Sequence, residues 1–215
     1  MKDYQLIIFD WDGTLMDSIA RIVSSIRALA QVNELIIPNE SAIKGIIGLS
    51  LEEAIVTLFP TANGATIEQL KTGYKKHYIE LDPTPTPLYS NAEQLLTALT
   101  QQGKMLAVAT GKAKTGLQRV MRETNLTRFF NHVRCGCECH SKPHPQMLEQ
   151  LLVECNVPPE SAVMIGDSML DMEMAKRAGV DSIGITHGVH NQEQLSMFQP
   201  KAIVGSLVEL QSLLR

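Results

Sequence analysis

Three acidic residues directly follow short apolar runs in this sequence. Asp10 and Asp12 come after Leu6–Phe9, and Asp167 comes after Ala162–Ile165. The carboxyl ends of strands form the ligand crevice of an open α/β sheet, so acids on two neighbouring strands would face each other there. Close carboxylates repel unless a cation lies between them, and oxygen ligands of this type favour Mg²⁺. A lone Asp at a strand end is usually a turn former, but this grouping favours a Mg²⁺ site.

Two further segments could bind an anion beside these acids. Thr110 and Gly111 follow the apolar run Met105–Ala109 and offer a hydroxyl and a backbone N–H to phosphate oxygens. Lys142 lies in the loop Ser-Lys-Pro-His-Pro, and its point charge suits a phosphate. An isolated lysine is usually a solvated surface residue, but the prolines favour a rigid loop and a fixed charge. Together these residues predict a phosphate site.

Most of the residues just described follow the ends of short apolar runs, and these runs alternate along the chain with amphipathic stretches. The predicted strands are Leu6–Phe9, Met105–Ala109, Ala162–Ile165, Ser182–Ile185 and Ala202–Val204. The predicted helices between them include one capped by Ser90 and Glu93 and ended by Gly103, one over Gln146–Asn156, and one over Asp171–Ala178. This alternation predicts an α/β fold with a doubly wound, Rossmann-like parallel sheet.

One segment, residues 16–82, interrupts the alternation and contains no convincing strand. Its apolar residues recur at helical spacing, and Ser50 with Glu53 forms a capping box. A stiff connector, Asp-Pro-Thr-Pro-Thr-Pro, follows at residues 82–87. We therefore expect a catalytic α/β core at 1–15 and 83–215, and a small all-helical cap at 16–82 inserted after the first strand.

Length and charge restrict the class of partner. The chain has 215 residues and a net charge of −4, with no basic run that would neutralise a nucleic-acid backbone. No stretch approaches the ~18 apolar residues of a membrane span, and the first apolar run is too short for a signal peptide. We expect a cytoplasmic protein that binds a small phosphorylated metabolite and neither nucleic acid nor membrane, as a monomer or homodimer.

Two features leave alternatives open. Cys135, Cys137 and Cys139 could bind a metal or be redox-active, but their C-x-C-x-C spacing is not the paired spacing of zinc modules, which favours plain reduced thiols. Trp11, between the two aspartates, could line the site or pack in the core.

Four segments together resemble the motifs of haloacid dehalogenase superfamily phosphatases. Asp10-Trp-Asp12-Gly13-Thr14-Leu15 resembles the D-x-D-G-T first motif, and Thr110-Gly-Lys112 resembles the second. Lys142 resembles the third, and Gly166-Asp167-Ser168-Met169-Leu170-Asp171 resembles the G-D-x-x-x-D fourth. The four occur in order, and the helical insert is similar to the cap of the phosphoglycolate phosphatase subgroup. The second motif departs from many relatives, which have Asn or Asp after the hydroxyl residue.

The resemblance implies a role for each acid. Asp10 would attack phosphorus and form an aspartyl-phosphate. Asp12 would protonate the leaving alkoxide and then activate water. Asp10, the backbone carbonyl of Asp12, and Asp167 would hold Mg²⁺.

The resemblance also assigns the groups around the phosphoryl group. Thr110, the Gly111 N–H and Lys142 would bind it, where charge stabilisation is most of catalysis. Asp171 would orient Lys142 or a metal-bound water. The cap would close over the site and select the substrate.

The expected activity is therefore hydrolysis of a small phosphomonoester, such as phosphoglycolate or a sugar phosphate. Arg21 and Lys44 are the candidates for contact with a substrate carboxylate, although each is as readily a surface charge.

Three other functions compete with this one. A phosphosugar mutase on the same fold would need a cap acid–base residue, and relatives place a His soon after the first motif, whereas the first His here is His77. A dehalogenase would lack the second Asp. A non-enzymatic phospho-receiver or binding domain would lack the D-x-D-G-T motif and the cap.

Overall fold

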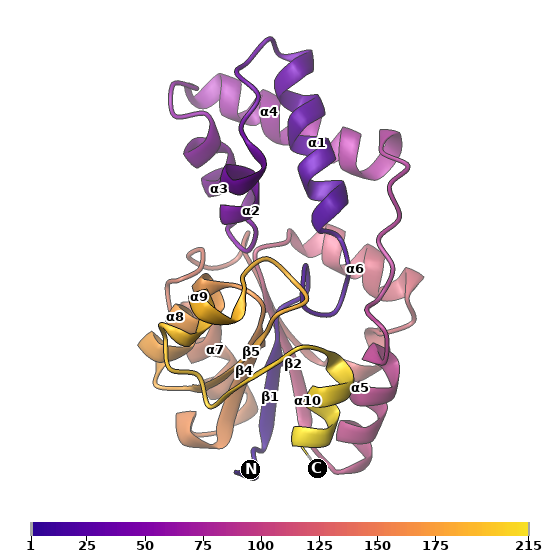
Figure 1. Cartoon of the computed structure of the whole chain (residues 1–215), viewed down its shortest axis with the longest axis vertical. Helices are drawn as coiled ribbons and strands as arrows, with labels where there is room; N and C mark the ends of the chain where they lie inside the picture. The colour runs from indigo at the N-terminus through magenta and orange to yellow at the C-terminus, as the bar shows by residue number, and fades with distance from the viewer. Residues whose placement is uncertain (1, 215) are drawn as a thin grey trace.

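The chain forms two lobes in the computed structural model, which describes residues 2–214 (Figure 1). The larger lobe is built on one parallel sheet with strand order β3-β2-β1-β4-β5-β6. Its strands are β1 Leu6–Phe9, β2 Met105–Thr110, β3 His132–Cys135, β4 Ala162–Gly166, β5 Asp181–Ile185 and β6 Ala202–Val204. The predicted doubly wound α/β fold is confirmed, and β1 lies between β2 and β4, where the strand order reverses.

Alternate residues of the central strands face two separate helix layers. Ile7 and Phe9 of β1 pack toward α5 (Ala92–Gln101), α6 (Lys114–Glu123) and α10 (Leu207–Leu213). Leu6 and Ile8 face the opposite layer, made by α7 (Gln146–Cys155) and α8 (Met169–Ala178). A short helix, α9 (Gln192–Ser196), packs against β5, β6 and α8, and 3₁₀ turns cover Thr127–Phe129 and Pro159–Ser161. Strands buried on both faces explain why the sequence showed continuous apolar runs.

Several local predictions need correction. β3 was not predicted, because it is an edge strand in which three of four residues are only partly buried. Ser90 does not cap α5: the N-cap is Asn91, whose φ of 71° lies in the left-handed region that Asn tolerates, and its side chain makes no capping bond. The helix predicted from Asp171 begins two residues earlier, at Met169.

The smaller lobe is helical and has a hydrophobic core of its own. It contains α1 Ile19–Val32, α2 Glu40–Gly45, α3 Leu51–Leu58, α4 Gly64–Lys76 and a π-helical turn over His77–Leu81. Ser50 caps α3 by accepting from the Glu53 N–H, which agrees with the expected start of that helix. The buried side chains of this helical lobe (residues 19–81) form a cluster distinct from both sheet layers. It sits over the carboxyl ends of the strands (Figure 1).

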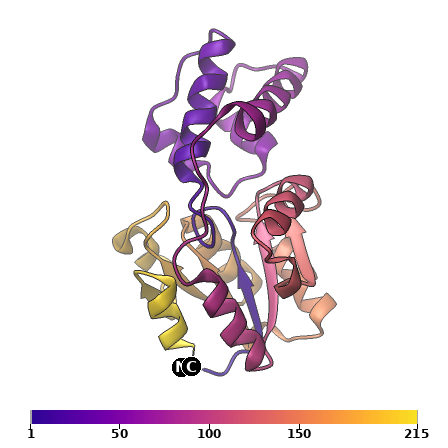
Figure 2. The same cartoon turned by 90° about the vertical axis from the view of Figure 1, so that its right-hand side faces the viewer.

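The two connections between the lobes run side by side (Figure 2). Asp17 donates from its backbone N–H to the Pro87 carbonyl at 2.8 Å, and Tyr89 donates to the Leu15 carbonyl at 3.0 Å. Met16 and Leu88 form an isolated antiparallel bridge between the same segments. The two linkers are therefore held together as one short double-stranded connection between the lobes. Among residues 2–214 no helix is long and apolar enough to cross a membrane.

Candidate active site

The loop after β1 folds over the end of β4. Gly13 has φ +86°, a conformation that favours glycine, and a Cβ there would lie 2.3 Å from Asp167 Oδ2. Thr14 donates from Oγ1 to Asp167 Oδ1 at 2.7 Å, and the Val189 N–H donates to Oδ2 at 2.8 Å. The D-G-T segment therefore fixes the orientation of the Asp167 carboxylate.

Three buried carboxylates meet at this edge of the sheet. Oxygens of Asp10, Asp167 and Asp171 lie within 4.8 Å of one another, and none of these residues is more than 2% exposed. The fully buried Lys142 ammonium lies 2.9 Å from Asp10 Oδ1 and 2.6 Å from Asp171 Oδ1. The structure thus brings together two of the predicted strand-end acids, Asp10 and Asp167, and the predicted lysine, which lies 132 positions after Asp10 in a loop before α7.

Burial of like charges raises the proton affinity of the cluster. Burial, with Asp171 adding to it, raises the pKa of Asp167 to about 7. Burial raises the pKa of Asp10 well above its usual range, although the nearby Lys142 opposes the shift. Burial on its own would lower the pKa of Lys142, but the Asp10 and Asp171 carboxylates reverse that effect and raise it. Three carboxylates face one ammonium, so the site lacks positive charge and its all-oxygen donor set fits a divalent cation.

Asp171 is held by the start of its own helix. Ser168 is the N-cap of α8, and Asp171 Oδ2 accepts from its backbone N–H at 3.1 Å and its hydroxyl at 2.6 Å. This capping box leaves Asp171 Oδ1 to accept from Lys142. The geometry is compatible with the predicted role in orienting Lys142.

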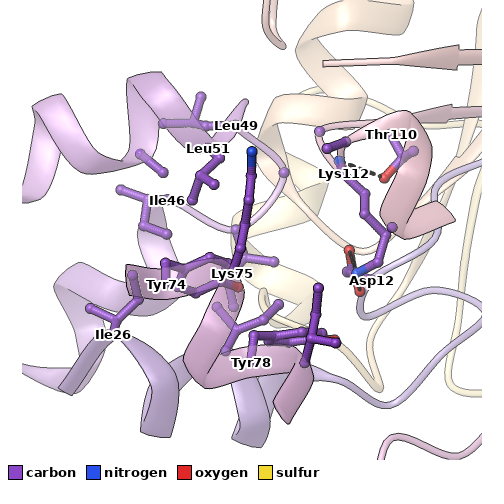
Figure 3. Close-up of a pocket in the computed structure, with 18 of the residues that line it drawn as sticks. Asp12, Ile26, Ile46, Leu49, Leu51, Tyr74, Lys75, Tyr78, Thr110 and Lys112 are labelled. Carbon is purple, nitrogen blue, oxygen red and sulfur yellow. Dashed lines mark hydrogen bonds and ion pairs between the residues drawn. The ribbon is translucent and has the colours of Figure 1, made fainter. Parts of the chain in front are cut away.

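Asp12 lies apart from the acid cluster and contacts a residue to which sequence reasoning gave no role. Both of its carboxylate oxygens accept from Lys112 Nζ at 2.9 Å, and the two residues are labelled in Figure 3. Asp12 Oδ1 also accepts from the Ser18 hydroxyl at 2.6 Å. The Lys112 ammonium also lies 5.0 Å from the centre of the Tyr78 ring, which belongs to the helical lobe. The one sequence feature that could have identified Lys112 as a site residue is its position beside a strand end, directly after the Thr110-Gly111 pair.

The β2 end carries the predicted phosphate-binding pair. Thr110 is 1% exposed and its Oγ1 accepts from the Lys112 N–H at 3.2 Å. Gly111 lies against the helical lobe: a Cβ there would be 2.2 Å from the Leu49 carbonyl oxygen and 2.4 Å from the Gly48 carbonyl oxygen. The absence of a side chain at Gly111 therefore allows the two lobes to meet.

We expect Gly111→Ala to separate the lobes, because the new methyl group would collide with two backbone carbonyls that cannot rotate away. A displacement of about 1 Å at a catalytic site typically costs about 10²-fold in rate, so kcat/KM should fall by about that factor. Small-angle scattering should show a larger radius of gyration.

The control for this variant is Gly64→Ala in the helical lobe, where a Cβ would meet nothing within 4 Å. Gly64→Ala should leave both kcat/KM and the radius of gyration unchanged. Wild-type kcat/KM and scattering in Gly111→Ala would show that the lobes do not need this contact.

A cavity of about 140 Å³ lies between the two lobes, next to the ends of β1 and β2 (Figure 3). Asp10, Asp12, Thr110 and Lys112 line its sheet side. The helices of the smaller lobe line the opposite side. The cavity therefore connects the strand-end acids with the segment expected to select the substrate.

The two predicted substrate contacts lie outside this cavity. Lys44 is exposed and pairs with Glu40 at 2.9 Å, one helical turn away. Arg21 donates from Nε to the Thr84 carbonyl, so it ties α1 to the return linker. Neither residue lines the cavity, whereas Lys75 on α4 does. No sequence signal separated Lys75 from the other basic residues at the end of α4.

Packing places Trp11 and the cysteines, the two features for which the sequence left alternatives open. Trp11 is fully buried and packs edge-to-face on Phe130 at 6.2 Å, so it belongs to the core rather than the cavity. Cys135 is buried and Cys137 is exposed. Within residues 2–214, only the Asp10, Asp167 and Asp171 cluster brings three potential metal ligands together, so these cysteines form no such group.

Comparison with known proteins gives one consistent result. The sequence model of the haloacid dehalogenase-like hydrolase family matches residues 7–185. A Dickeya dadantii protein that bears the name "Probable phosphatase IndB" is 32% identical, covering 95% of this chain and 91% of that protein. A phosphoglycolate phosphatase of Vibrio cholerae is 28% identical, covering 98% of both chains. The crystal structure of a haloacid dehalogenase-like hydrolase from Bacteroides fragilis superposes with a TM-score of 0.89 at 26% identity, covering 96% of this chain and 99% of that one.

Proposed function

Because the chain belongs to the haloacid dehalogenase-like hydrolase family, we propose that it is a Mg²⁺-dependent phosphatase of small phosphomonoesters. The observation that carries this proposal is the buried cluster of Asp10, Asp167 and Asp171 around Lys142. The cluster lies at the strand ends and opens into the cavity through Asp10. Residues 1–15 and 83–215 supply the chemistry, and residues 16–82 form the cap that selects the substrate.

Asp10 is the nucleophile. Its Oδ1 accepts from the Trp11 N–H at 2.7 Å and from Lys142, and Oδ2 takes part in neither bond. Oδ2 attacks phosphorus, the bond from phosphorus to the ester oxygen breaks, and an aspartyl-phosphate forms. Lys142, Thr110 and the Gly111 N–H stabilise the charge on the transferring phosphoryl oxygens.

Asp12 moves the protons in both steps. It donates a proton to the leaving alkoxide and later removes one from the water that attacks the aspartyl-phosphate. That attack breaks the acyl–phosphate bond, releases phosphate and restores the Asp10 carboxylate. Lys112 and Ser18 hold the Asp12 side chain in place, so they are positioning residues.

Mg²⁺ would be held by Asp10, Asp167 and the Asp12 carbonyl, and there it would neutralise charge on the phosphate oxygens. The deficit of positive charge in the cluster supports this assignment. Thr14 and Val189 each use one lone pair of an Asp167 oxygen, which leaves further lone pairs for a metal.

The lining of the cavity favours hydrolysis over phosphosugar mutase chemistry. A mutase needs an acid–base group in the cap, yet no His, Asp or Glu of the helical lobe is among the described residues that line the cavity. Water is then the acceptor of the phosphoryl group. Membership in a hydrolase family also disfavours a non-enzymatic receiver or binding domain.

The proposal predicts that Mg²⁺ stabilises the protein more at pH 8 than at pH 5. The pKa of Asp167 is about 7 in the metal-free fold, above its ordinary value of 3.8. The folded state therefore binds the extra proton, and the stability of metal-free protein should fall as pH rises from about 4 to 7. Mg²⁺ must displace that proton at low pH, so binding is weaker there. At 100-fold over its Kd, Mg²⁺ should add about 2.7 kcal/mol at pH 8.

Thermal unfolding with Mg²⁺ or chelator at both pH values measures this effect, and hydrolysis of p-nitrophenyl phosphate in the same buffers measures activity. Asp167→Asn should lose the Mg²⁺-dependent rise in Tm. Full hydrolysis in excess chelator, or the same rise in Tm at both pH values, would contradict the metal assignment.

A further inference from the structure

The wall of the cavity on the helical lobe is almost entirely apolar. It contains aliphatic and aromatic side chains from α1, α3, α4 and the segments next to them, and several of these are labelled in Figure 3. The apolar residues of this wall are Ile22, Ile26, Ile46, Ile47, Leu49, Leu51, Ala54, Tyr74, Tyr78 and Ile79. Because they surround the side opposite Asp10 and Asp12, they face the part of a bound ester that leaves as the alcohol.

Polar groups on this wall are few. Among the described residues that line the cavity, the helical lobe contributes no carboxylate, side-chain amide, serine or threonine. Its one charged side chain there is Lys75, which takes part in no ion pair among the described residues. The other polar side chains of this wall are Tyr74 and Tyr78, each with a single hydroxyl on an aromatic ring, and the buried Tyr78 hydroxyl has no hydrogen-bond partner among the described residues. On the sheet side, Lys112 is already bound to Asp12 and Arg119 to Glu123.

This distribution has a direct consequence for binding. A sugar hydroxyl placed against aliphatic side chains loses its hydrogen bonds to water and gains none, and such a loss costs binding affinity. An alkyl or aryl group gains affinity at the same place, because its surface leaves water. Ile79 supports this view: it lines the cavity and yet remains 48% exposed, so an apolar ligand would cover it.

We propose that the substrate of this site is a phosphomonoester whose alcohol part is apolar, either alkyl or aryl, and fills the space against the helical lobe. The inference rests on the proposed phosphatase function, because that function places the phosphoryl group at Asp10. It narrows the expected substrates away from sugar phosphates, and it leaves Lys75 as the one cationic cap side chain among the described residues that line the cavity.

The affinity of non-hydrolysable n-alkylphosphonates, from methyl to hexyl, tests the proposal without any turnover. Calorimetry in Mg²⁺ should show Kd falling by about fourfold for each added methylene, the gain expected when one CH₂ is buried, until the cavity is full. In parallel, hexyl phosphate should have a higher kcat/KM than ethyl phosphate, phosphoglycolate or glucose 6-phosphate. Ethyl and hexyl alcohols are equally poor leaving groups, so the difference would report binding.

Two matched variants test where the alkyl group lies. Ile79→Thr keeps the β-branched shape but makes the cavity mouth polar, and it should weaken hexylphosphonate severalfold while leaving methylphosphonate unchanged. Val56→Thr makes the same kind of change at a cap residue that is 44% exposed and lies outside the cavity. It should leave both ligands unchanged.

The outcomes separate this inference from the phosphatase proposal. Affinity that is flat or falls with chain length, or no binding by any phosphonate, would overturn the apolar substrate. Hydrolysis of p-nitrophenyl phosphate that depends on Asp10 would leave the phosphatase proposal standing in that case. Affinity that rises with chain length without hydrolysis of any ester would support the apolar site and overturn the phosphatase.

Discussion

Replacement of Asp10 by asparagine is expected to lower kcat by about 10⁶-fold, the scale seen when the nucleophile of a hydrolase is removed. The change is nearly isosteric, and Asn can still accept from the Trp11 N–H and from Lys142 through its amide oxygen. The fold should therefore survive. The variant should form no phosphoenzyme, which acid quenching and mass spectrometry of the intact protein would measure.

The Asp12→Asn variant is the control for this experiment, because it removes proton transfer and keeps the nucleophile. Its kcat should fall by about 10²–10⁴-fold. With p-nitrophenyl phosphate, whose leaving group needs little protonation, phosphoenzyme should still form and then persist. Wild-type turnover in Asp10→Asn, or equal loss of phosphoenzyme in both variants, would place the nucleophile elsewhere.

The core of this fold was predictable from the sequence because its strands are buried on both faces. Such strands leave continuous apolar runs, and the acids at their ends are brought together by topology alone. The edge strand His132–Cys135 has one partner strand and partly exposed residues, so it lacked that signal. The start of α5 depends on the left-handed conformation of Asn91, a backbone choice that the Ser90–Glu93 pattern did not reveal.

The side-chain contacts of the site were less predictable than its backbone. Asp12 and Asp10 are two positions apart, yet one carboxylate binds Lys112 and the other binds Lys142. That division depends on which lysine reaches which carboxylate once the loops are folded. The cavity wall was also unpredictable, because its apolar residues show the same helical spacing as the rest of the cap core. Lys44 was chosen because it precedes a glycine-rich turn, and that turn does line the cavity, but the sequence did not reveal in which direction the preceding helix presents Lys44.

Replacement of Lys142 by methionine is expected to destabilise the protein far more than the same replacement of the exposed Lys44. Lys142 is completely buried and lies within 3 Å of the Asp10 and Asp171 carboxylates. Without it, buried carboxylates remain with no positive partner, and breaking such a pair typically costs about 3–5 kcal/mol. Activity should be lost as well, because the ammonium stabilises the transferring phosphoryl group. Urea denaturation in chelator measures the change in the free energy of unfolding.

The pH dependence of the loss of stability in Lys142→Met distinguishes a charge effect from a packing effect. In Lys142→Met the carboxyl groups should hold protons up to a higher pH in the folded state than in the unfolded state, so stability should fall as pH rises. The difference from wild type should therefore be larger at pH 8 than at pH 5. A loss equal at both pH values would instead indicate a packing defect. Lys44→Met, the same change at a lysine whose only ion pair is exposed, should shift stability by less than about 0.5 kcal/mol. A Lys142→Met variant as stable as Lys44→Met at pH 8 would contradict the charge balance on which the proposed site depends.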